Sequence, residues 1–146
     1  MKESLYIVIV GCGRLGSYLA NHLSHAGHSV VVIDSNEETF GDLSSDFSGF
    51  RVVGDATELA VLREAKLDEA DVLLATARED NVNLMVAQIA GKLFHVAHVL
   101  ARVFDPRREQ IYKQHGIETV CPTALVAAAL IGSVAGGGAV PEEGLP

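Results

Sequence analysis

A glycine-rich motif near the start of the chain is the clearest candidate for chemistry. Its residues are, in order, Gly11, Cys12, Gly13, Arg14, Leu15 and Gly16. It follows an apolar run at residues 5–10 and precedes leucines at helical spacing, which predicts a buried strand, this turn and an amphipathic helix. There the first glycine permits a tight turn, the second lets phosphate approach the backbone, and the third lets helix and strand pack closely. The helix N-terminus favours an anion, so phosphate binding is predicted over a glycine turn without a ligand.

An acidic residue closes the next apolar run, at residues 30–33. Asp34 follows the motif by about 20 residues, where a carboxylate accepts hydrogen bonds from the hydroxyls of an adenosine ribose. The alternative is that Asp34 only caps the next helix. Ser35 and Asn36 provide no cation for a 2′-phosphate, so NADP is disfavoured. These motifs recognise adenosine diphosphate, which leaves both NAD(H) and ATP/ADP open.

Two arginines are candidate phosphate ligands. Arg14 lies inside the motif, where a cation opposes the helix dipole. That position favours a charge-assisted contact to the pyrophosphate or a terminal phosphate over an exposed cation at a helix start. Arg102 lies near the end of the apolar run 98–103, and a buried arginine there needs an anionic partner in the protein or in a ligand.

Two further segments follow expected strands, at the carboxyl edge where ligands bind in parallel sheets. Asp55 and Ala56 come after the brief strand at 51–53. Asp55 either meets the adenine amino group or caps the following helix. Thr76 and Ala77 come after the strand at 71–75, beside the expected topological switch point. Thr76 is also expected to cap a helix in a box with Glu79.

Strands and helices alternate along the chain. Strands are expected at residues 5–10, 30–33, 51–53, 71–75, 98–103 and 119–121. This alternation predicts an α/β fold, a Rossmann-like doubly wound parallel sheet of about six strands with helices on both faces. Asp105 and Pro106 are typical of a helix start.

Two of the expected helices carry specific patterns. The weaker, over residues 36–47, places Phe40, Leu43 and Phe47 on one side. The clearer one carries an apolar stripe formed by Val82, Met85, Val86, Ile89 and Leu93.

Residues 1–134 are expected to form one domain, and residues 135–146 a flexible Gly/Pro tail. The last helix, at 123–134, is apolar all round. One face can cover the sheet edge, and the other would remain as an apolar patch on a monomer. A two-fold partner would cover that patch, so a homodimer interface is expected at this helix.

Composition excludes several function classes. Half of the chain (49%) is hydrophobic, and the net charge of -8 argues against nucleic acid or an anionic membrane surface as the main partner. Cys12 and Cys121 have no metal-site spacing and read as reduced thiols of a cytoplasmic protein. No signal peptide is recognised, and the apolar stretch 124–135 is shorter than the roughly 20 residues that span a bilayer.

No catalytic apparatus accompanies the motif. No base is placed to activate Cys12, and Tyr112 is followed four residues later by Gly116 where a Tyr-x-x-x-Lys pair needs lysine. The six histidines form no constellation that suggests catalysis or metal binding. The sequence therefore indicates a binding site without an enzyme, and no metal.

Five motifs in order make the chain resemble the TrkA-N domain over residues from about 5 to 133. They are the segments 7–16, 32–34, 53–57, 75–76 and 101–103. This domain is the nucleotide-sensing N-terminal half of RCK regulators of potassium channels and of Trk/Ktr-type potassium uptake. The resemblance implies a cytoplasmic regulatory subunit that binds NAD(H) or ATP/ADP, forms a homodimer or higher oligomer, and sits beneath an integral-membrane potassium transporter or channel subunit.

The resemblance also completes the expected site. Its residues are Gly11, Cys12, Gly13, Arg14, Leu15, Gly16, Asp34, Ser35, Asp55, Ala56, Thr76, Ala77 and Arg102. Full regulators carry a second RCK subdomain after the last helix, where this sequence has its Gly/Pro tail, so ring assembly stays open. Two rival hypotheses are a small NAD-dependent oxidoreductase and a non-catalytic Rossmann oligomerisation module.

Overall fold

The computed structural model describes residues 3–136, and six parallel strands form a single sheet in it. The strands are β1 (Tyr6–Val10), β2 (Ser29–Asp34), β3 (Phe50–Val53), β4 (Val72–Ala75), β5 (His98–Arg102) and β6 (Glu118–Val120). Their order across the sheet is β3-β2-β1-β4-β5-β6, and every neighbouring pair is parallel. The predicted doubly wound fold is confirmed, with its switch point between β1 and β4.

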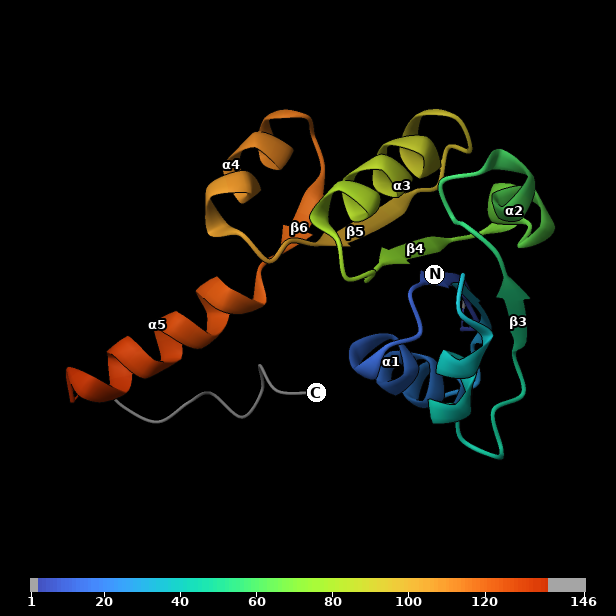
Figure 1. The fold of residues 1–146 in the computed structure, drawn as a ribbon, viewed down its shortest axis with the longest axis horizontal. Coiled ribbons are helices and arrows are strands. Elements are labelled where there is room, and N and C mark those ends of the chain that lie inside the picture. Colours follow the sequence, from blue (N-terminus) through green and yellow to red (C-terminus); the bar gives the residue numbers. More distant parts are fainter. Residues whose placement is uncertain (1–2, 137–146) are drawn as a thin grey trace.

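Helices lie on both faces of this sheet. They are α1 (Arg14–His25), the 3₁₀ helix η1 (Glu37–Asp42), α2 (Leu59–Glu64), the 3₁₀ helix η2 (Leu67–Glu69), α3 (Asp80–Lys92), α4 (Pro106–Gln114) and α5 (Pro122–Val134). Figure 1 shows α2, α3 and α4 on one face and α1 on the other, while α5 extends away from the body. No helix within residues 3–136 is long and apolar enough to cross a membrane.

The core has two parts because successive side chains of a strand point to opposite faces. In β1, Val8 and Val10 belong to the cluster under α2, α3 and α4, whereas Ile7 and Ile9 belong to the cluster under α1. All four are at most 3% exposed. Strands buried on both faces are near-continuous apolar runs, which is why the sequence pattern located them.

The helix predicted over residues 36–47 is wrong in type. The structure forms only η1 there, followed by a loop. The burial prediction is confirmed, because Phe40, Leu43 and Phe47 are each 8% exposed and pack in the cluster under α1. These aromatic and aliphatic anchors therefore hold the segment against the sheet without a regular α-helix.

The buried face of α3 also differs from the predicted stripe. Met85 and Leu93 are 50% and 61% exposed, although Val86 is buried as expected. The face that packs on the sheet includes Asn83, Ala87 and Ala90. Val82 and Ile89 of the predicted stripe also pack against this core, so the prediction is wrong only for Met85 and Leu93.

Two predicted helix starts have different outcomes. Asp105 caps α4 as expected, since its carboxylate accepts a hydrogen bond from the Arg107 amide at 3.0 Å. The capping box of Thr76 with Glu79 is wrong. Glu79 itself is the N-cap of α3, and the Thr76 hydroxyl donates to the backbone at the end of β1.

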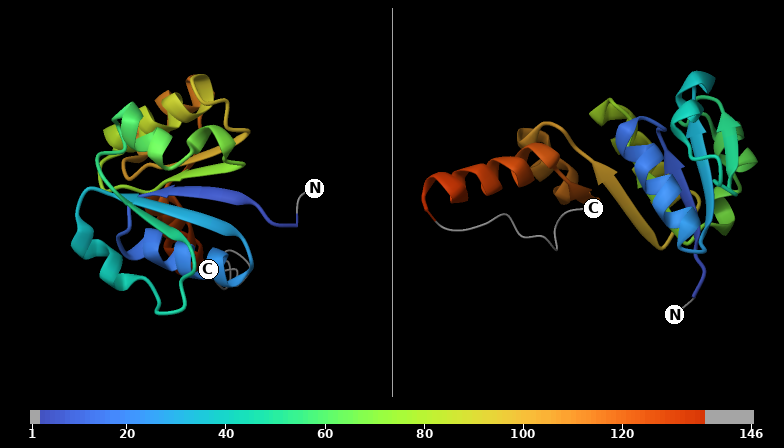
Figure 2. Two further views of the ribbon diagram at one scale, coloured as in Figure 1. Left: turned by 90° about the vertical axis from the view of Figure 1, so that its right-hand side faces the viewer. Right: turned by 90° about the horizontal axis from the view of Figure 1, so that it is seen from below.

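The last helix does not cover the sheet edge, contrary to the expectation for residues 123–134. None of the residues of α5 is buried. Leu125, Val126, Leu130 and Ile131 are 57–68% exposed. Figure 2 shows α5 projecting from the end of β6 and away from α1.

Candidate functional site

The glycine loop joins β1 to α1 in a turn that requires glycine at two positions. Gly11 has a φ of +96°, and a Cβ there would lie 2.9 Å from the backbone of Thr76 and Ala77. A Cβ on Gly16 would collide with the carbonyl oxygen of Gly11. The first glycine therefore serves the tight turn and the third serves close packing, as the motif predicts.

The second glycine leaves space in front of α1. Gly13 is the N-cap of α1, and a Cβ built on it would meet nothing within 4 Å. No side chain caps this end, and the first turn has no acidic residue. Arg14 is the first residue of the helix and is exposed, and Leu15 follows it half-buried. The dipole and the guanidinium together make this end attractive to an anion.

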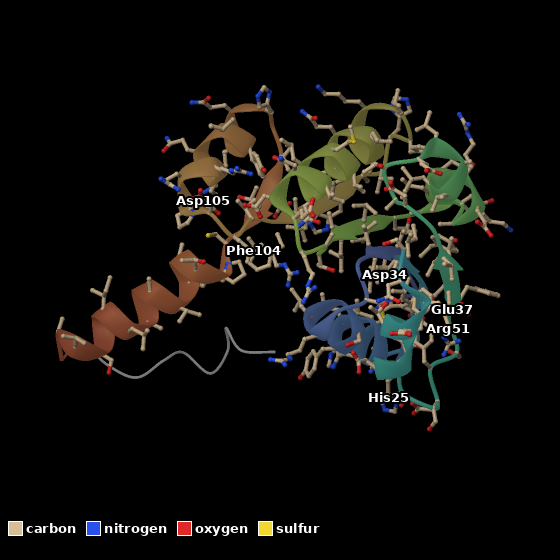
Figure 3. The ribbon with its side chains drawn as sticks, in the orientation of Figure 1. His25, Asp34, Glu37, Arg51, Phe104 and Asp105 are labelled. Atoms are coloured by element: carbon tan, nitrogen blue, oxygen red, sulfur yellow. The ribbon has the colours of Figure 1, made fainter. Side chains whose placement is uncertain are left out.

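Asp34 is fixed beside the glycine loop by two backbone amides. Its Oδ2 accepts a hydrogen bond from the Cys12 amide at 2.8 Å, and its Oδ1 accepts one from the Asn36 amide at 2.9 Å. The cap of η1 is Asn36, not Asp34. Each carboxylate oxygen can accept a further bond, so the group remains available to hydroxyl donors. Figure 3 labels Asp34 above the start of α1, and Ser35 next to it is exposed.

Cys12 is not suited to nucleophilic chemistry. Its side chain is fully buried, and burial together with the charge of Asp34 raises the pKa of the thiol to about 11. The thiol is therefore protonated at neutral pH, whereas a cysteine nucleophile must be a thiolate.

Of the two alternatives for Asp55, the structure bears on the capping of α2. Its Oδ1 accepts hydrogen bonds from the amide and the hydroxyl of Thr57, at 2.9 and 2.6 Å. These bonds lower the pKa of Asp55. The cap of α2 is Glu58, so the capping prediction is wrong. Ala56 is 6% exposed and belongs to the core.

Thr76 ties the end of β4 to the glycine loop. Its hydroxyl lies 2.9 Å from the carbonyl oxygen of Val10 and 3.3 Å from that of Gly11. Thr76 is 8% exposed, so this link is shielded from water. The neighbouring Ala77 is half-buried, and its amide and carbonyl are both bonded to the Asn83 side chain, at 2.8 and 2.9 Å.

Arg102 has backbone partners where an anion was expected. Its Nη2 donates to the carbonyl oxygens of Thr76 and Ala77, at 2.7 and 3.2 Å, and its guanidinium lies 4.4 Å from the centre of the Phe104 ring. Within residues 3–136 no carboxylate forms an ion pair with it. Its Nε is buried without a hydrogen-bond partner. Burial lowers the pKa of the guanidinium, which nevertheless stays charged.

The hydrogen bonds join most of the predicted residues into one site. The glycine loop is bonded to Asp34 on one side and to Thr76 on the other, and Thr76 to Arg102. Asp55 and Ala56 follow β3, which is separated from β1 by β2. Between the ends of β4 and β5 lies an open cavity of about 520 Å³, lined by Arg78, Glu79, Asp80, Asn81, Phe104, Asp105 and Arg108. Figure 3 labels Phe104 and Asp105 at this end.

Asn83 is a residue that the sequence reasoning missed. It is completely buried, and besides Ala77 its side chain bonds the carbonyl oxygen of Arg102 at 3.0 Å. Its position between Val82 and Leu84, among the apolar residues of the helix, is the signal that could have found it. The described part of the chain contains no group of three or more potential metal ligands.

Comparison with known proteins identifies relatives of this site and fold. The TrkA-N domain family matches residues 7–123. A Trk system potassium uptake protein TrkA from Streptomyces coelicolor is 41% identical over 137 residues, which are 94% of this chain and 61% of that protein. Across three such curated relatives, the chain spans between 48% and 61% of their length.

Solved structures agree in fold. The TrkA-N domain of inner membrane protein ybaL from Escherichia coli has a TM-score of 0.77 at 20% identity, covering 90% of this chain and 97% of that one. GsuK bound to ADP has a TM-score of 0.73 at 26% identity, covering 90% of this chain and 34% of that one. Because the family matches most of the sequence, the chain belongs to the TrkA-N domain family.

Proposed function

We propose that this chain is the nucleotide-sensing part of a regulator of potassium uptake, and that it binds an adenine nucleotide on the glycine loop. The observation that carries the proposal is the bond from the Cys12 amide to Asp34, which fixes a ribose acceptor beside the open end of α1. The relative from Streptomyces coelicolor is a potassium uptake protein, and a related GsuK structure holds ADP.

The ligand is proposed to be NAD(H) or ATP/ADP. Both contain the adenosine diphosphate that a glycine loop and a strand-end acid recognise. NADP is disfavoured because Asp34, Ser35 and Asn36 offer no cation to its 2′-phosphate, and the Asp34 carboxylate would repel that group.

We further propose that the protein regulates without chemistry of its own. The Cys12 thiol beside the loop is held protonated, and the Asp34 carboxylate accepts the backbone amides of Cys12 and Asn36, an arrangement suited to holding hydroxyl groups. Regulation then requires that two nucleotides differ in affinity for two conformations of the regulator. The proposed recipient of the signal is an integral-membrane potassium transporter or channel subunit, which places the chain at the cytoplasmic face of the membrane.

A second copy of the chain is the proposed partner of α5. The register pairs Leu74 with Leu100 and Arg102 with Val120, so Leu100, Arg102 and Val120 lie on the face that bears α1. Val120 is 44% exposed, and the main contacts of α1 with the sheet are to β1 and β2. Parallel sheets are normally covered on both faces, so the uncovered face of β5 and β6 and the bare α5 favour a dimer.

The nucleotide proposal is tested by calorimetric titration with ADP, NAD and NADP. ADP and NAD are expected to bind and NADP to bind more weakly. Gly13→Val is expected to abolish binding, because its side chain would fill the space in front of α1. Gly91→Val is the matched control, since a Cβ on Gly91 of α3 also meets nothing within 4 Å. Retained affinity in a folded Gly13→Val protein would place the ligand elsewhere.

A further inference from the structure

A continuous set of contacts runs from the glycine loop to the first turn of α5. Thr76 bonds the Gly11 carbonyl, and Arg102 bonds the Thr76 carbonyl and stacks on Phe104. The carbonyl oxygen of Phe104 then accepts a hydrogen bond from the Thr123 hydroxyl at 2.9 Å. Because no residue of α5 is buried, this first turn is where the helix meets the rest of the domain.

Arg102 is the member of this set that a phosphate would disturb. Its guanidinium is partly desolvated, its Nε has no hydrogen-bond partner, and the guanidinium contacts neutral carbonyls and an aromatic ring. Its bonds to these carbonyls join one ionised group to a neutral one, whereas a bond to a phosphate joins two ionised groups and adds their Coulomb attraction. A phosphate on the glycine loop is therefore a stronger partner than the carbonyl of Thr76. The register also puts Arg102 on the face of the sheet that bears α1 and the loop.

We propose that Arg102 couples the phosphates of a bound nucleotide to the position of α5. The inference rests on the nucleotide binding proposed above and states how binding at that site changes the position of α5. When the guanidinium turns towards a phosphate, it leaves the Thr76 carbonyl and the Phe104 ring. The Phe104 carbonyl then holds Thr123 less firmly, and α5 is released to change its direction. Arg102 acts here as a positioning residue, because it reaches α5 only through Phe104.

Other hydrogen bonds of Phe104 fix its amide, so the coupling acts through its carbonyl. Its amide donates to the Asp80 carboxylate at 2.8 Å, which ties it to the start of α3. Its carbonyl is shared between Thr123 and the Cys121 thiol, the latter at 3.9 Å. A movement of Phe104 with its amide fixed therefore changes the direction of the carbonyl that α5 depends on.

Hydrogen exchange of the full chain with and without ADP tests the coupling. In the wild type, ADP is expected to protect residues 11–17 and to speed exchange over residues 123–128 roughly fivefold, the factor that one ordinary hydrogen bond is worth. Arg102→Met and Thr123→Val are each expected to lose the change at 123–128. Thr123→Val is expected to leave the ADP protection of residues 11–17 intact, because the hydroxyl that it removes bonds only the Phe104 carbonyl, at the end of the set furthest from the loop.

Matched controls separate this coupling from general loosening. Arg63→Met removes an exposed arginine on α2, and Thr39→Val removes a similar hydroxyl-to-carbonyl bond of 2.8 Å in η1. Both are expected to retain the ADP effect on α5. Arg102→Lys, which keeps the charge, is expected to restore part of the effect lost in Arg102→Met.

The outcomes distinguish this inference from the proposed function. If ADP protects the wild-type loop but leaves α5 unchanged, the coupling is wrong and nucleotide binding stands. If ADP protects nothing in the wild type, the proposed function fails and the coupling with it. An α5 effect that persists in Thr123→Val or in a folded Arg102→Met protein overturns the role of these contacts. If Arg102→Met does not bind ADP, hydrogen exchange over residues 123–128 in Thr123→Val decides whether the coupling is right.

Discussion

At the scale of single residues, Asp34 links two requirements of the site. Its carboxylate accepts the Cys12 amide within the glycine loop, so it shapes the loop and at the same time offers lone pairs at the end of β2. The Asn36 amide on the other oxygen fixes its orientation. We therefore expect Asp34 to favour ligands with free ribose hydroxyls and to disfavour a 2′-phosphate.

Asp34→Ala is expected to weaken ADP binding by about 1.5–3 kcal/mol, the usual scale for a hydrogen bond to a charged group. Calorimetric titration measures the loss. Asp42→Ala removes an exposed acid of η1 and serves as control, with affinity expected to stay at the wild-type value. Because Asp34 also holds the loop, a thermal melt of the variant must remain cooperative. Unchanged affinity in such a folded variant would contradict the assignment of Asp34 to the ribose.

Cys12 makes the stability of the domain sensitive to alkaline pH. Its thiol pKa is raised from 9.0 to about 11, by burial first and by the Asp34 charge second. The folded state therefore favours the protonated thiol more than the unfolded state does. This contribution is complete below pH 9 and is lost as the pH rises towards 11.

Urea unfolding of the wild type from pH 8 to 11 is therefore expected to show a decline in stability that is shallower in Cys12→Ala. Cys121→Ala is the control, because Cys121 is also buried but lies outside the loop. Parallel curves for wild type and Cys12→Ala would show that the thiol does not titrate as described.

At the scale of elements, Asn83 joins α3 to two strands. Its side chain bonds both backbone groups of Ala77 after β4 and the carbonyl of Arg102 on β5. Asn83→Ala would leave these buried groups without partners, and we expect a loss of about 3 kcal/mol in unfolding free energy. Urea denaturation measures it. Asn81→Ala, an exposed change on the same helix, is expected to lose less than about 1 kcal/mol.

The strands of the fold could be predicted from the sequence more fully than the packing of the helices. All six strands were predictable because short apolar runs alternate with segments of helical spacing. The loop after β1 was predictable because its glycines directly follow such a run. The buried face of α3 was predictable only in part. Val82, Val86 and Ile89 pack on the core as expected, but apolar residues surround this helix, and the pattern did not show that Ala87 and Ala90 would be buried while Met85 is exposed.

The sequence also could not predict hydrogen bonds between residues that are far apart in the chain. The spacing placed Arg102 and Thr76 at the same edge of the sheet, but it could not show that a guanidinium would bond carbonyls where a carboxylate was expected. Asn83 was missed for the same reason, since its partner on β5 lies 19 residues away in sequence. Local pattern identifies such residues as polar and buried, and only the packed fold supplies what they bond.

At the scale of the whole molecule, the helix α5 is an apolar surface left bare. It has no charged residue, and none of its residues is buried. The edge of the sheet formed by β5 and β6 also lacks a covering helix on the α1 face among the described elements, as Figure 1 shows. That face carries Leu100 and Val120 beside the charged Arg102. Contiguous apolar surface such as that of α5 commonly marks an interaction site.

A homodimer through α5 is therefore expected, and light scattering of the purified protein measures its mass. Leu130→Glu should dissociate it, because burying an unpaired carboxylate in an apolar interface costs several kcal/mol. Leu93→Glu is the matched control. Leu93, the C-cap of α3, is 61% exposed and Leu130 of α5 is 62% exposed, so both substitutions add the same charge to an equally exposed leucine. Dimer loss in Leu93→Glu alone would move the interface to α3, and a wild-type monomer would remove α5 from the proposed mechanism.

The shape of the dimer is expected to depend on the bound nucleotide. ADP and ATP can shift the dimer only if they differ in affinity for its two shapes. X-ray scattering with each nucleotide should therefore give different profiles for the wild type and identical profiles for Leu130→Glu.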